Sequence, residues 1–364
     1  MKLVMIMLIG LLFLGQANGK DLIFSGNKEK VFKISSWTLQ SDSSTPMDEI
    51  AKKFEIISRK GNTYEIYVLD SDVSKFKALA PNAILNSLDT DAEIHNNLLI
   101  NPGLSAGYRD FESVNQTLQG LAQKFPNIVK LEVIGQSTNG LTQYGLKISD
   151  NVNVDEDEPE LIMTSATHGD EIITTEVLLR FIESLISGYQ QNPRLTAMID
   201  THELFFVPVV NPDGFIAQRR YSGNIDPNRD YPWPGHEEKV SVQCIANMIN
   251  FFKARKFSGS IDFHAFGELI MYPWAFTKEA PIRSDEIIFD KLGQEMSAAN
   301  SYTYGQISKV IYVAEGSSAD YYYWKFNTLA FGIEIANSKA PPVSQIPKIL
   351  NQVTEMTYKF IEHF

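Results

Sequence analysis

His168 and Glu171 stand three positions apart, between a short apolar run and an apolar-periodic segment. This pattern predicts a buried strand over 161–163, a tight turn and the start of a helix. In that arrangement the imidazole and the carboxylate face one point, and zinc takes nitrogen and oxygen ligands. The alternative is a surface turn with a glutamate at a helix N-terminus, because a two-residue motif is common and the helix dipole favours an acid there.

A third candidate ligand, His264, ends a predicted strand over 259–264. Two histidines and one glutamate leave a coordination position for water, which is typical of catalytic zinc sites rather than structural ones. The sequence therefore predicts one zinc ion per chain, held by His168, Glu171 and His264. The other histidines have no potential ligand at a useful spacing: His95, His202, His236 and His363.

A second set of polar residues lies between Glu171 and His264 in the sequence. Asn211-Pro212-Asp213-Gly214 is a turn motif, and Asn228 and Arg229 follow a second turn at Asp226-Pro227. An adjacent amide and guanidinium can hold a carboxylate, because the guanidinium binds both oxygens at once. A surface loop with a solvated arginine is the alternative interpretation.

The elements around these residues alternate between strands and helices. Polar groups gather at the predicted strand ends, so the segment 108–364 is expected to form an α/β domain with a mixed central sheet and helices on both faces. The expected strands are 129–134, 143–148, 161–163, 205–207, 259–264 and 331–335, and the expected helices are 114–124, 240–253 and 346–364.

Residues 1–19 have the features of a signal peptide. Lys2 precedes an apolar run over 3–14, and Ala17-Asn18-Gly19 is an acceptable cleavage site. The run is short for a membrane span, so an uncleaved anchor is the weaker alternative. We therefore expect a secreted or periplasmic protein with no membrane segment after cleavage. The single cysteine, Cys244, excludes an intrachain disulfide and is expected to be a buried helix residue.

Residues 20–88 are expected to form a small α+β module. Strand and helix patterns follow in the order β-α-β-β-α-β, starting with a strand at 31–34, which suggests a ferredoxin-like arrangement. Residues 89–107 are polar, contain Pro102 and Gly103, and are expected to form a linker. Because this linker contains neither lysine nor arginine, a trypsin-like protease would not cleave it.

The chain of 364 residues has a formal net charge of -12. Nucleic-acid binding requires a basic surface, so this charge argues against a nucleic-acid partner. We expect a monomer.

From Tyr108 to the C-terminus the chain resembles the zinc metallocarboxypeptidases of the carboxypeptidase A/B superfamily. The order and spacing of several motifs carry the resemblance: His168-x-x-Glu171, Asn211-Pro212-Asp213-Gly214, Asp226-x-Asn228-Arg229, His264 followed by Gly267-Glu268 and by Met271-Tyr272-Pro273-Trp274, Tyr312, and Glu334. The resemblance implies zinc-dependent hydrolysis of the C-terminal residue of peptides or proteins.

The resemblance also implies roles for individual side chains. Glu334 would be the general base and Asp226 would orient His168. Asn228 and Arg229 would bind the carboxylate of the substrate. An arginine before this pair would stabilise the oxyanion, and its spacing favours Arg219, with Arg220 as the alternative. Tyr312 would close over the substrate.

The aligned specificity pocket contains no acidic residue: Met271, Ala275, Ile307, Ile311, Ala314, Ala319 and Gly332. A buried cation needs an acidic partner, so we expect preference for neutral, apolar or aromatic C-terminal residues. Glu315 adjoins the pocket and is the feature that could favour a basic residue. Two departures from the pancreatic enzymes are Asp170, which stands in place of an arginine, and Ala265-Phe266.

Two other functions stay open at this point. Some relatives cut peptidoglycan stem peptides with the same chemistry, and an inactive domain could bind peptides without cleaving them. The N-terminal module resembles the pro-regions of the superfamily, and it is either retained or removed by a protease without tryptic specificity.

Overall fold

The computed structural model describes residues 33–89, 107–237 and 240–364, and the predicted signal peptide and most of the predicted linker lie outside these ranges. The smaller part is an antiparallel sheet in the order β2-β3-β1-β4, with a helix after β1 and another after β3. This confirms a small α+β module. Its elements are β1 (Ile34–Gln40), α1 (Met47–Lys53), β2 (Glu55–Lys60), β3 (Thr63–Leu69), α2 (Val73–Leu79) and β4 (Ile84–Ser87).

The module has a core of its own, built around the buried side chains of Trp37, Ile50, Ile66 and Phe76. Its first strand was predicted over 31–34. Residues 31 and 32 lie outside the described residues, and the described strand runs from Ile34 to Gln40, where it pairs with β3 and β4.

The larger part is built on an eight-stranded sheet in the order β11-β10-β12-β9-β7-β8-β6-β5. The four central strands β12, β9, β7 and β8 are parallel, whereas β6 and β5 join antiparallel, so the sheet is mixed as predicted. The strands are β5 (Val129–Gln136), β6 (Thr142–Ile148), β7 (Glu160–Ser165), β8 (Glu203–Val207), β9 (Phe257–His264), β10 (Leu269–Tyr272), β11 (Thr303–Gln306) and β12 (Leu329–Glu334).

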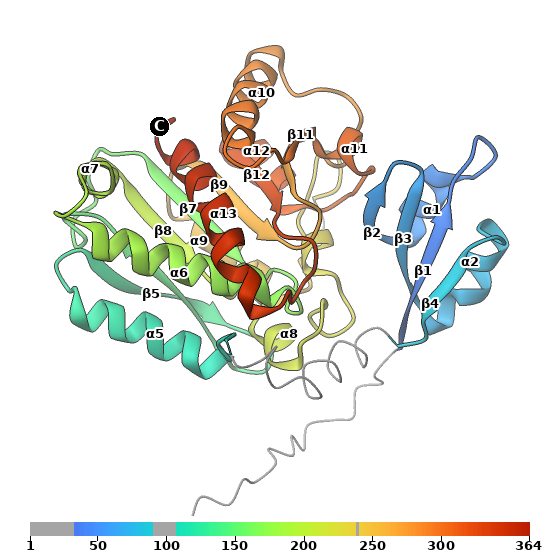
Figure 1. Cartoon of the computed structure of the whole chain (residues 1–364), viewed down its shortest axis with the longest axis horizontal. Helices are drawn as coiled ribbons and strands as arrows, with labels where there is room; N and C mark the ends of the chain where they lie inside the picture. The colour runs from blue at the N-terminus through green and yellow to red at the C-terminus, as the bar shows by residue number, and fades with distance from the viewer. Residues whose placement is uncertain (1–32, 90–106, 238–239) are drawn as a thin grey trace, which may run out of the picture. The chain divides into compact units, whose positions relative to one another are not determined.

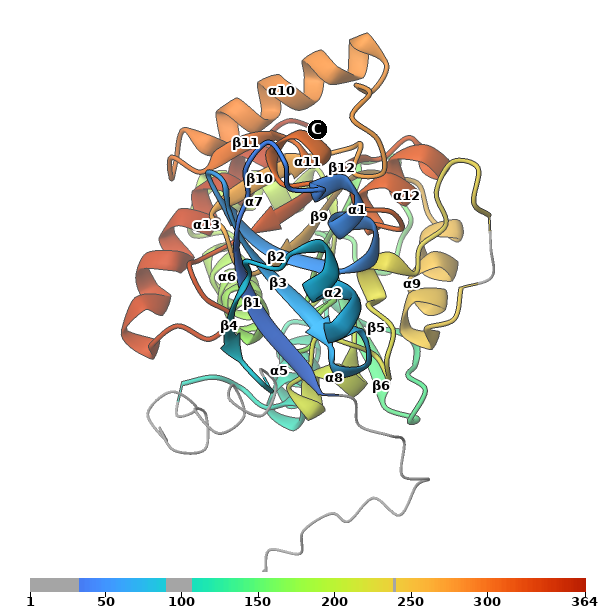
Figure 2. The same cartoon turned by 90° about the vertical axis from the view of Figure 1, so that its right-hand side faces the viewer.

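Helices cover both faces of this sheet. Figure 1 shows α6 and α13 in front of the strands, and in Figure 2 they lie on the opposite side of the strands from α9 and α12. The helices are α5 (Phe111–Lys124), α6 (Ile172–Gly188), α7 (Pro193–Asp200), α8 (Pro212–Ala217), α9 (Gln243–Lys253), α10 (Arg283–Ser297), α11 (Ile307–Val310), α12 (Ser318–Phe326) and α13 (Ile346–Ile361).

Two sequence-based boundaries differ from the structure. The helix predicted over 240–253 begins at Gln243, because the Asp230 carboxylate accepts hydrogen bonds from the backbone of Ser241 and Val242 and holds them extended. No element was predicted between 265 and 330, where the structure has β10, α10, β11, α11 and α12. The two strands there have four residues each, too few for a clear periodicity.

The parallel strands explain why distant residues meet. Their carboxyl ends lie at one edge of the sheet, where ligands bind in open α/β folds. His264 is the last residue of β9, Glu334 is the last residue of β12, and the two are partners in the register of these strands. His168 lies three positions beyond the end of the neighbouring strand β7.

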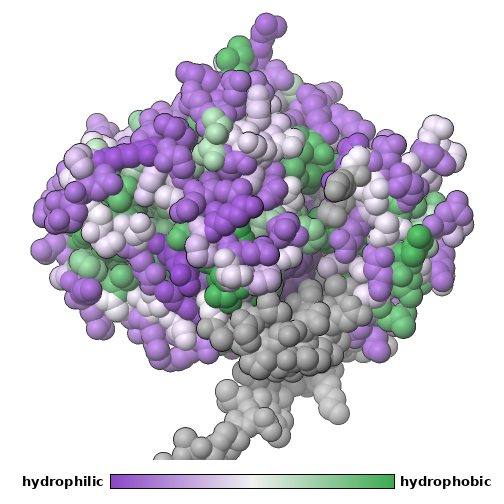
Figure 3. All heavy atoms as spheres, viewed as in Figure 1, coloured by the Kyte–Doolittle hydropathy of each residue, from purple (hydrophilic) through white to green (hydrophobic). Residues whose placement is uncertain are grey.

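The core of the larger part lies between the sheet and its helices and includes Cys244 of α9, which is buried as predicted. On the face drawn in Figure 3, hydrophilic side chains prevail and hydrophobic ones form small separate patches. None of the helices in the described ranges is both long and apolar enough to cross a membrane.

Candidate active site

The three predicted metal ligands come together in the structure. Nδ1 of His168 lies 2.9 Å from Oε1 of Glu171 and 3.0 Å from Nδ1 of His264, and His264 Nδ1 lies 3.1 Å from Glu171 Oε2. All three side chains are buried. Two imidazole nitrogens and a carboxylate that converge in this way are the donor set of a catalytic zinc site.

The turn between β7 and α6 brings His168 and Glu171 into place, and it depends on Gly169. A Cβ atom at this position would lie 2.0 Å from the carbonyl carbon of Gly214, so only glycine fits against that backbone. Gly214 is held in turn by the side chain of Asn211, which accepts a hydrogen bond from the Gly214 amide. The two motifs that the sequence showed separately therefore pack directly on each other.

A second set of carboxylates orients the two histidines. Nε2 of His168 donates to Asp226 at 3.0 Å, and Nε2 of His264 donates to Asp262 at 3.1 Å. In the neutral imidazole this leaves Nδ1 of each ring as the ligand atom, the usual role of such outer partners. Asp262 is itself fixed by three hydroxyl donors, those of Thr164, Thr167 and Ser318.

Asp262 was missed in the sequence analysis. The sequence does contain a signal for it: Asp262 stands two positions before His264 in the same strand, and residues i and i+2 of a strand point to the same face. A carboxylate in that position can reach the far nitrogen of the imidazole.

The electrostatics of the site favour a cation. Burial raises the pKa of Glu171, but the neighbouring His168 and the hydrogen bonds of both histidines lower it well below its usual value. Burial lowers the pKa of His264, but the charge and hydrogen bond of Asp262 raise it well above its usual value. A guanidinium nitrogen of Arg220 lies 3.1 Å from His168 Nδ1 and 3.3 Å from Glu171 Oε1. The donors thus attract positive charge, as a zinc site requires.

Glu334 lies at the end of β12 and lines the same cavity as the three donors. Its Oε2 accepts no hydrogen bond from the described residues. Burial and the charge of Glu171 raise its pKa to about 7. A carboxylate that takes up and releases a proton near neutral pH has the property that a general base needs.

Of the two adjacent arginines, the structure brings Arg220 to the site. Arg220 is 6% exposed, lines the cavity, and donates from Nη2 to Asp226 at 3.0 Å. Arg219, which the spacing favoured, does not line it. The cause is local: Gln218 adopts a left-handed conformation at the end of α8, and the Arg219 amide then bonds back to Gly214, so the next side chain turns inward.

Asn228 and Arg229 lie on a short 3-10 turn that begins at Asp226, whose side chain accepts a hydrogen bond from the Asn228 amide. The guanidinium of Arg229 donates to the Asn228 carbonyl at 2.8 Å and to the Tyr312 hydroxyl at 2.9 Å. All three residues line the cavity with the metal donors. This places two predicted carboxylate-binding groups and the predicted mobile tyrosine together.

This cavity has a volume of about 90 Å³, and its apolar lining residues form what we call the apolar recess. All of the predicted pocket residues line it: Met271, Ala275, Ile307, Ile311, Ala314, Ala319 and Gly332. The only carboxylates among its lining residues are Glu171 and Glu334. Glu315 lines a neighbouring cavity instead. The buried Asp320 accepts hydrogen bonds from the amides of Ala275, which lines the cavity, and Phe276.

Comparison with known proteins decides the family. The sequence profile described as zinc carboxypeptidase matches residues 114–356. The chain belongs to the zinc carboxypeptidase family. It is 28% identical over 287 residues to a zinc carboxypeptidase of Saccharothrix mutabilis subsp. capreolus, and the match covers 66% of this chain and 64% of that protein.

The chain is also 26% identical to carboxypeptidase D of Mus musculus, with 70% of this chain and 21% of that protein covered. It thus spans less than two thirds of the length of these relatives. In overall fold it is similar to carboxypeptidase A from Helicoverpa armigera, with a TM-score of 0.75 at 18% identity over 91% of this chain and 98% of that one. Thrombin-activatable fibrinolysis inhibitor has a TM-score of 0.66 at 17% identity over 91% and 98%.

The small module also contributes residues to the cavity of this zinc carboxypeptidase domain. Ile56, Ile57 and Arg59 of β2 are among the lining residues. The Tyr312 hydroxyl donates to the Ile56 carbonyl at 2.5 Å, and a guanidinium nitrogen of Arg59 donates to the Ile311 carbonyl at 3.4 Å. Backbone and side chains of β2 therefore contact residues that line the apolar recess.

Proposed function

We propose that this chain is a zinc-dependent exopeptidase that releases the C-terminal residue of peptides or proteins, with a preference for neutral apolar or aromatic residues. One observation supports this function above all. A single cavity is lined by the His–Glu–His donors, Glu334, the pair Asn228 and Arg229, and the apolar recess, with no carboxylate among its lining residues besides Glu171 and Glu334.

In this proposal His168, Glu171 and His264 would hold one zinc ion, which would supply Lewis-acid chemistry for the scissile carbonyl and for the attacking water. Glu334 accepts a proton from the attacking water and later returns it to the leaving amine. The pKa of about 7 at Glu334 suits a group that must act first as base and then as acid.

The other polar residues position the substrate. Asn228 and Arg229 hold its terminal carboxylate, whose two oxygens match the guanidinium fork. Arg220, rather than Arg219, stabilises the oxyanion, because it is the arginine beside the metal donors. Tyr312 closes over the bound residue, which occupies the recess formed in part by Met271 and Ala319.

The specificity is tested with matched peptides that end in Phe or Lys. We expect faster release of Phe, because a lysine ammonium in the apolar recess would lack an acidic partner. Purified peptidoglycan stem peptides serve as a third substrate. Faster release of Lys, or cleavage confined to the stem peptides, would contradict the proposed preference.

The role of Glu334 is tested with Glu334→Gln. We expect turnover to fall by about 10³-fold, within the range of general-base catalysis, because the amide cannot accept the proton. Bound zinc, measured by atomic absorption, should stay near one per chain. Glu279→Gln, an exposed glutamate outside the cavity, is the matched control. Equal turnover in the two variants would remove Glu334 from the mechanism.

We further propose that residues 20–88 are a pro-region that blocks this site until they are removed or displaced. The contacts of Ile56, Ile57 and Arg59 with the cavity support this role. N-terminal sequencing of the secreted protein, paired with activity measurements, tests it. A mature terminus after residue 88 is expected in the active form. Full activity in a chain that begins at Lys20 would contradict the blocking role and still confirm signal cleavage.

A further inference from the structure

The carboxylate of Asp262 has more partners than the support of one histidine requires. It is 4% exposed and accepts hydrogen bonds from four side chains. The donors are Thr164 Oγ1 at 2.9 Å, Thr167 Oγ1 at 3.0 Å, Ser318 Oγ at 2.8 Å and His264 Nε2 at 3.1 Å. A carboxylate offers about four acceptor sites, so these donors use its capacity and fix both of its oxygens.

The four donors come from three parts of the fold. Thr164 lies in β7, and Thr167 stands in the turn directly before His168. His264 is the last residue of β9, and Ser318 is the first residue of α12. One buried carboxylate therefore joins the turn that carries one predicted metal ligand, the strand that carries another, and the start of a helix.

The start of α12 connects this carboxylate with the substrate-binding pair. The Ser318 backbone amide donates to Asn228 Oδ1 at 2.8 Å, which orients the side-chain amide and leaves Nδ2 as the donor for a substrate carboxylate. Asn228 Nδ2 also lies 3.3 Å from His264 Nε2. The hydroxyl of Ser318 holds Asp262 while its amide holds Asn228, so both groups are fixed through one residue.

We infer that Asp262 is a positioning residue that fixes His264 for zinc and, through Ser318, Asn228 for the substrate carboxylate. This inference deepens the proposed function and rests on it. Asp262 is not among the residues that line the cavity, so it acts through the two side chains that do. Its two connections use different hydrogen bonds, and each connection can be removed separately.

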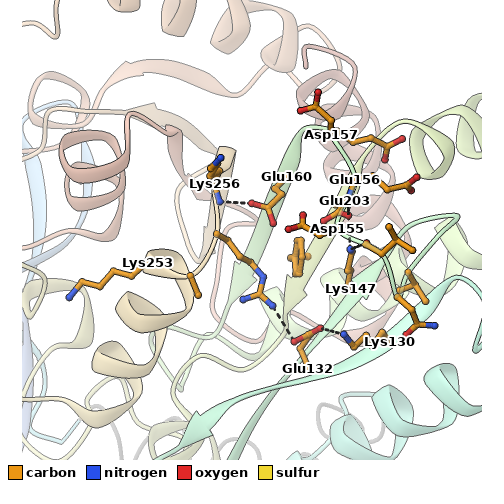
Figure 4. A pocket seen from close by; sticks show the side chains of 17 residues that line it. Lys130, Glu132, Lys147, Asp155, Glu156, Asp157, Glu160, Glu203, Lys253 and Lys256 are labelled. Carbon is orange, nitrogen blue, oxygen red and sulfur yellow. Dashed lines mark hydrogen bonds and ion pairs between the residues drawn. The ribbon is translucent and has the colours of Figure 1, made fainter.

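The opposite end of the sheet offers a matched control. Glu203, the first residue of β8, is 1% exposed and accepts hydrogen bonds from Lys147 at 2.6 Å and from the Glu156 amide at 3.1 Å. Figure 4 shows Glu203 close to Lys147 in a cavity of about 690 Å³. The metal donors follow the other ends of the strands, so Glu203→Gln measures only the general cost of changing a buried carboxylate.

The first test measures zinc affinity by competition with a chelator, in the full-length chain. Asp262→Asn should weaken zinc binding by about 10- to 100-fold, because an amide accepts hydrogen bonds at only one of its two ends. In steady-state kinetics of the zinc-loaded protein on a peptide ending in Phe, KM should also rise. Glu203→Gln should keep both values within about twofold of the wild type. Wild-type zinc affinity in Asp262→Asn, or equal losses in both variants, would overturn the inference.

The second test separates the two connections. Ser318→Ala removes the hydroxyl but keeps the backbone amide, so zinc affinity should stay within about twofold of the wild type. KM should rise by about threefold or more at nearly unchanged kcat, the size of effect expected for one lost hydrogen bond. A wild-type KM in this variant would overturn the connection between Asp262 and Asn228.

A third variant serves if Asp262→Asn does not fold. Thr167→Val removes one donor to Asp262 and should weaken zinc binding by about threefold or more. Unchanged zinc affinity would then overturn the inference. Zinc titration requires no hydrolysis, so the two proposals fail differently. Wild-type zinc binding without peptide hydrolysis would contradict the proposed function, whereas unchanged zinc affinity in the variant would contradict the role of Asp262.

Discussion

At the scale of single residues, the arginine beside the metal donors offers the sharpest comparison. Arg219 and Arg220 are neighbours in the chain. Arg220 lines the cavity and contacts Asp226, His168 and Glu171, whereas Arg219 is not among the residues that line the cavity. The two positions therefore serve as each other's control.

We predict that Arg220→Lys lowers kcat by about 10²-fold or more, the usual effect of removing a donor to the oxyanion. A lysine ammonium cannot reproduce the planar fork that bonds Asp226 and reaches the donors. Arg219→Lys should leave kcat within about twofold of the wild type. Steady-state kinetics on a peptide ending in Phe checks both, and the reverse order would restore Arg219 as the catalytic arginine.

At the scale of elements, the turns before α12 decide where the carboxylate-binding pair lies. Gly316 has a φ of +78°, and a Cβ atom there would lie 2.4 Å from the Arg229 carbonyl oxygen. The Gly316 carbonyl in turn accepts a hydrogen bond from the Tyr231 amide. A side chain at 316 would push this segment away from Arg229.

We predict that Gly316→Ala lowers stability by about 1–3 kcal/mol and raises KM, because backbone strain and the displaced Arg229 act together. Gly235→Ala is the matched control: its φ is +86°, and no atom lies within 4 Å of the position of its Cβ. It carries the same kind of strain without the contact. If both variants lose stability equally and both keep the wild-type KM, the contact with Arg229 has no role in binding.

The start of α12 also contains a buried titratable group, Asp320, which is fully buried against the amides of Ala275 and Phe276. Burial raises its pKa from 3.8 to about 7. A raised pKa means that the folded state binds more protons than the unfolded state. The stabilisation of the folded state by the protonated Asp320 is therefore fully present below pH 4. It is lost as the pH rises to about 7.

We predict that Asp320→Asn removes this dependence of the free energy of unfolding on pH. From pH 4 to 7 the wild-type free energy of unfolding should fall, relative to the variant, by at most about 1.4 kcal/mol per pH unit. The variant should be less stable at low pH, because its amide cannot accept both backbone hydrogen bonds in one orientation. Urea titrations of both proteins across this range measure the difference. Parallel pH profiles would show that Asp320 is not the titrating group.

At the scale of the whole molecule, the proposed zinc site joins three segments that are distant in sequence. His168 and Glu171 follow β7, His264 ends β9, and Asp226 holds His168 from a separate loop. A ligand that binds only where these segments meet stabilises the folded chain as a whole.

We predict that dialysis against 1,10-phenanthroline abolishes peptide hydrolysis and lowers Tm by about 5 °C, and that equimolar zinc restores both. His202→Gln, which lies outside the site, should show the same loss and recovery. His264→Ala should show no recovery with zinc. Recovery in that variant would mean that the ion binds elsewhere.

The sequence alone predicted the fold class, the principal motifs and the family of this protein. Local patterns reach a few residues along the chain, so they identified the His168-x-x-Glu171 turn, the strand that ends at His264, and the mixed α/β class confirmed by the eight-stranded sheet. The motif order pointed to the zinc carboxypeptidases, which the family match confirmed. Composition and spacing are enough for such features because each depends on neighbours in the chain.

Tertiary structure decided what depends on packing between distant segments. The backbone contact between Gly169 and Gly214, the inward turn of Arg220 and the support of His264 by Asp262 appear only when the parallel strands align their carboxyl ends. Sequence specifies which groups are present, whereas burial and mutual distance set their charge, partners and reactivity.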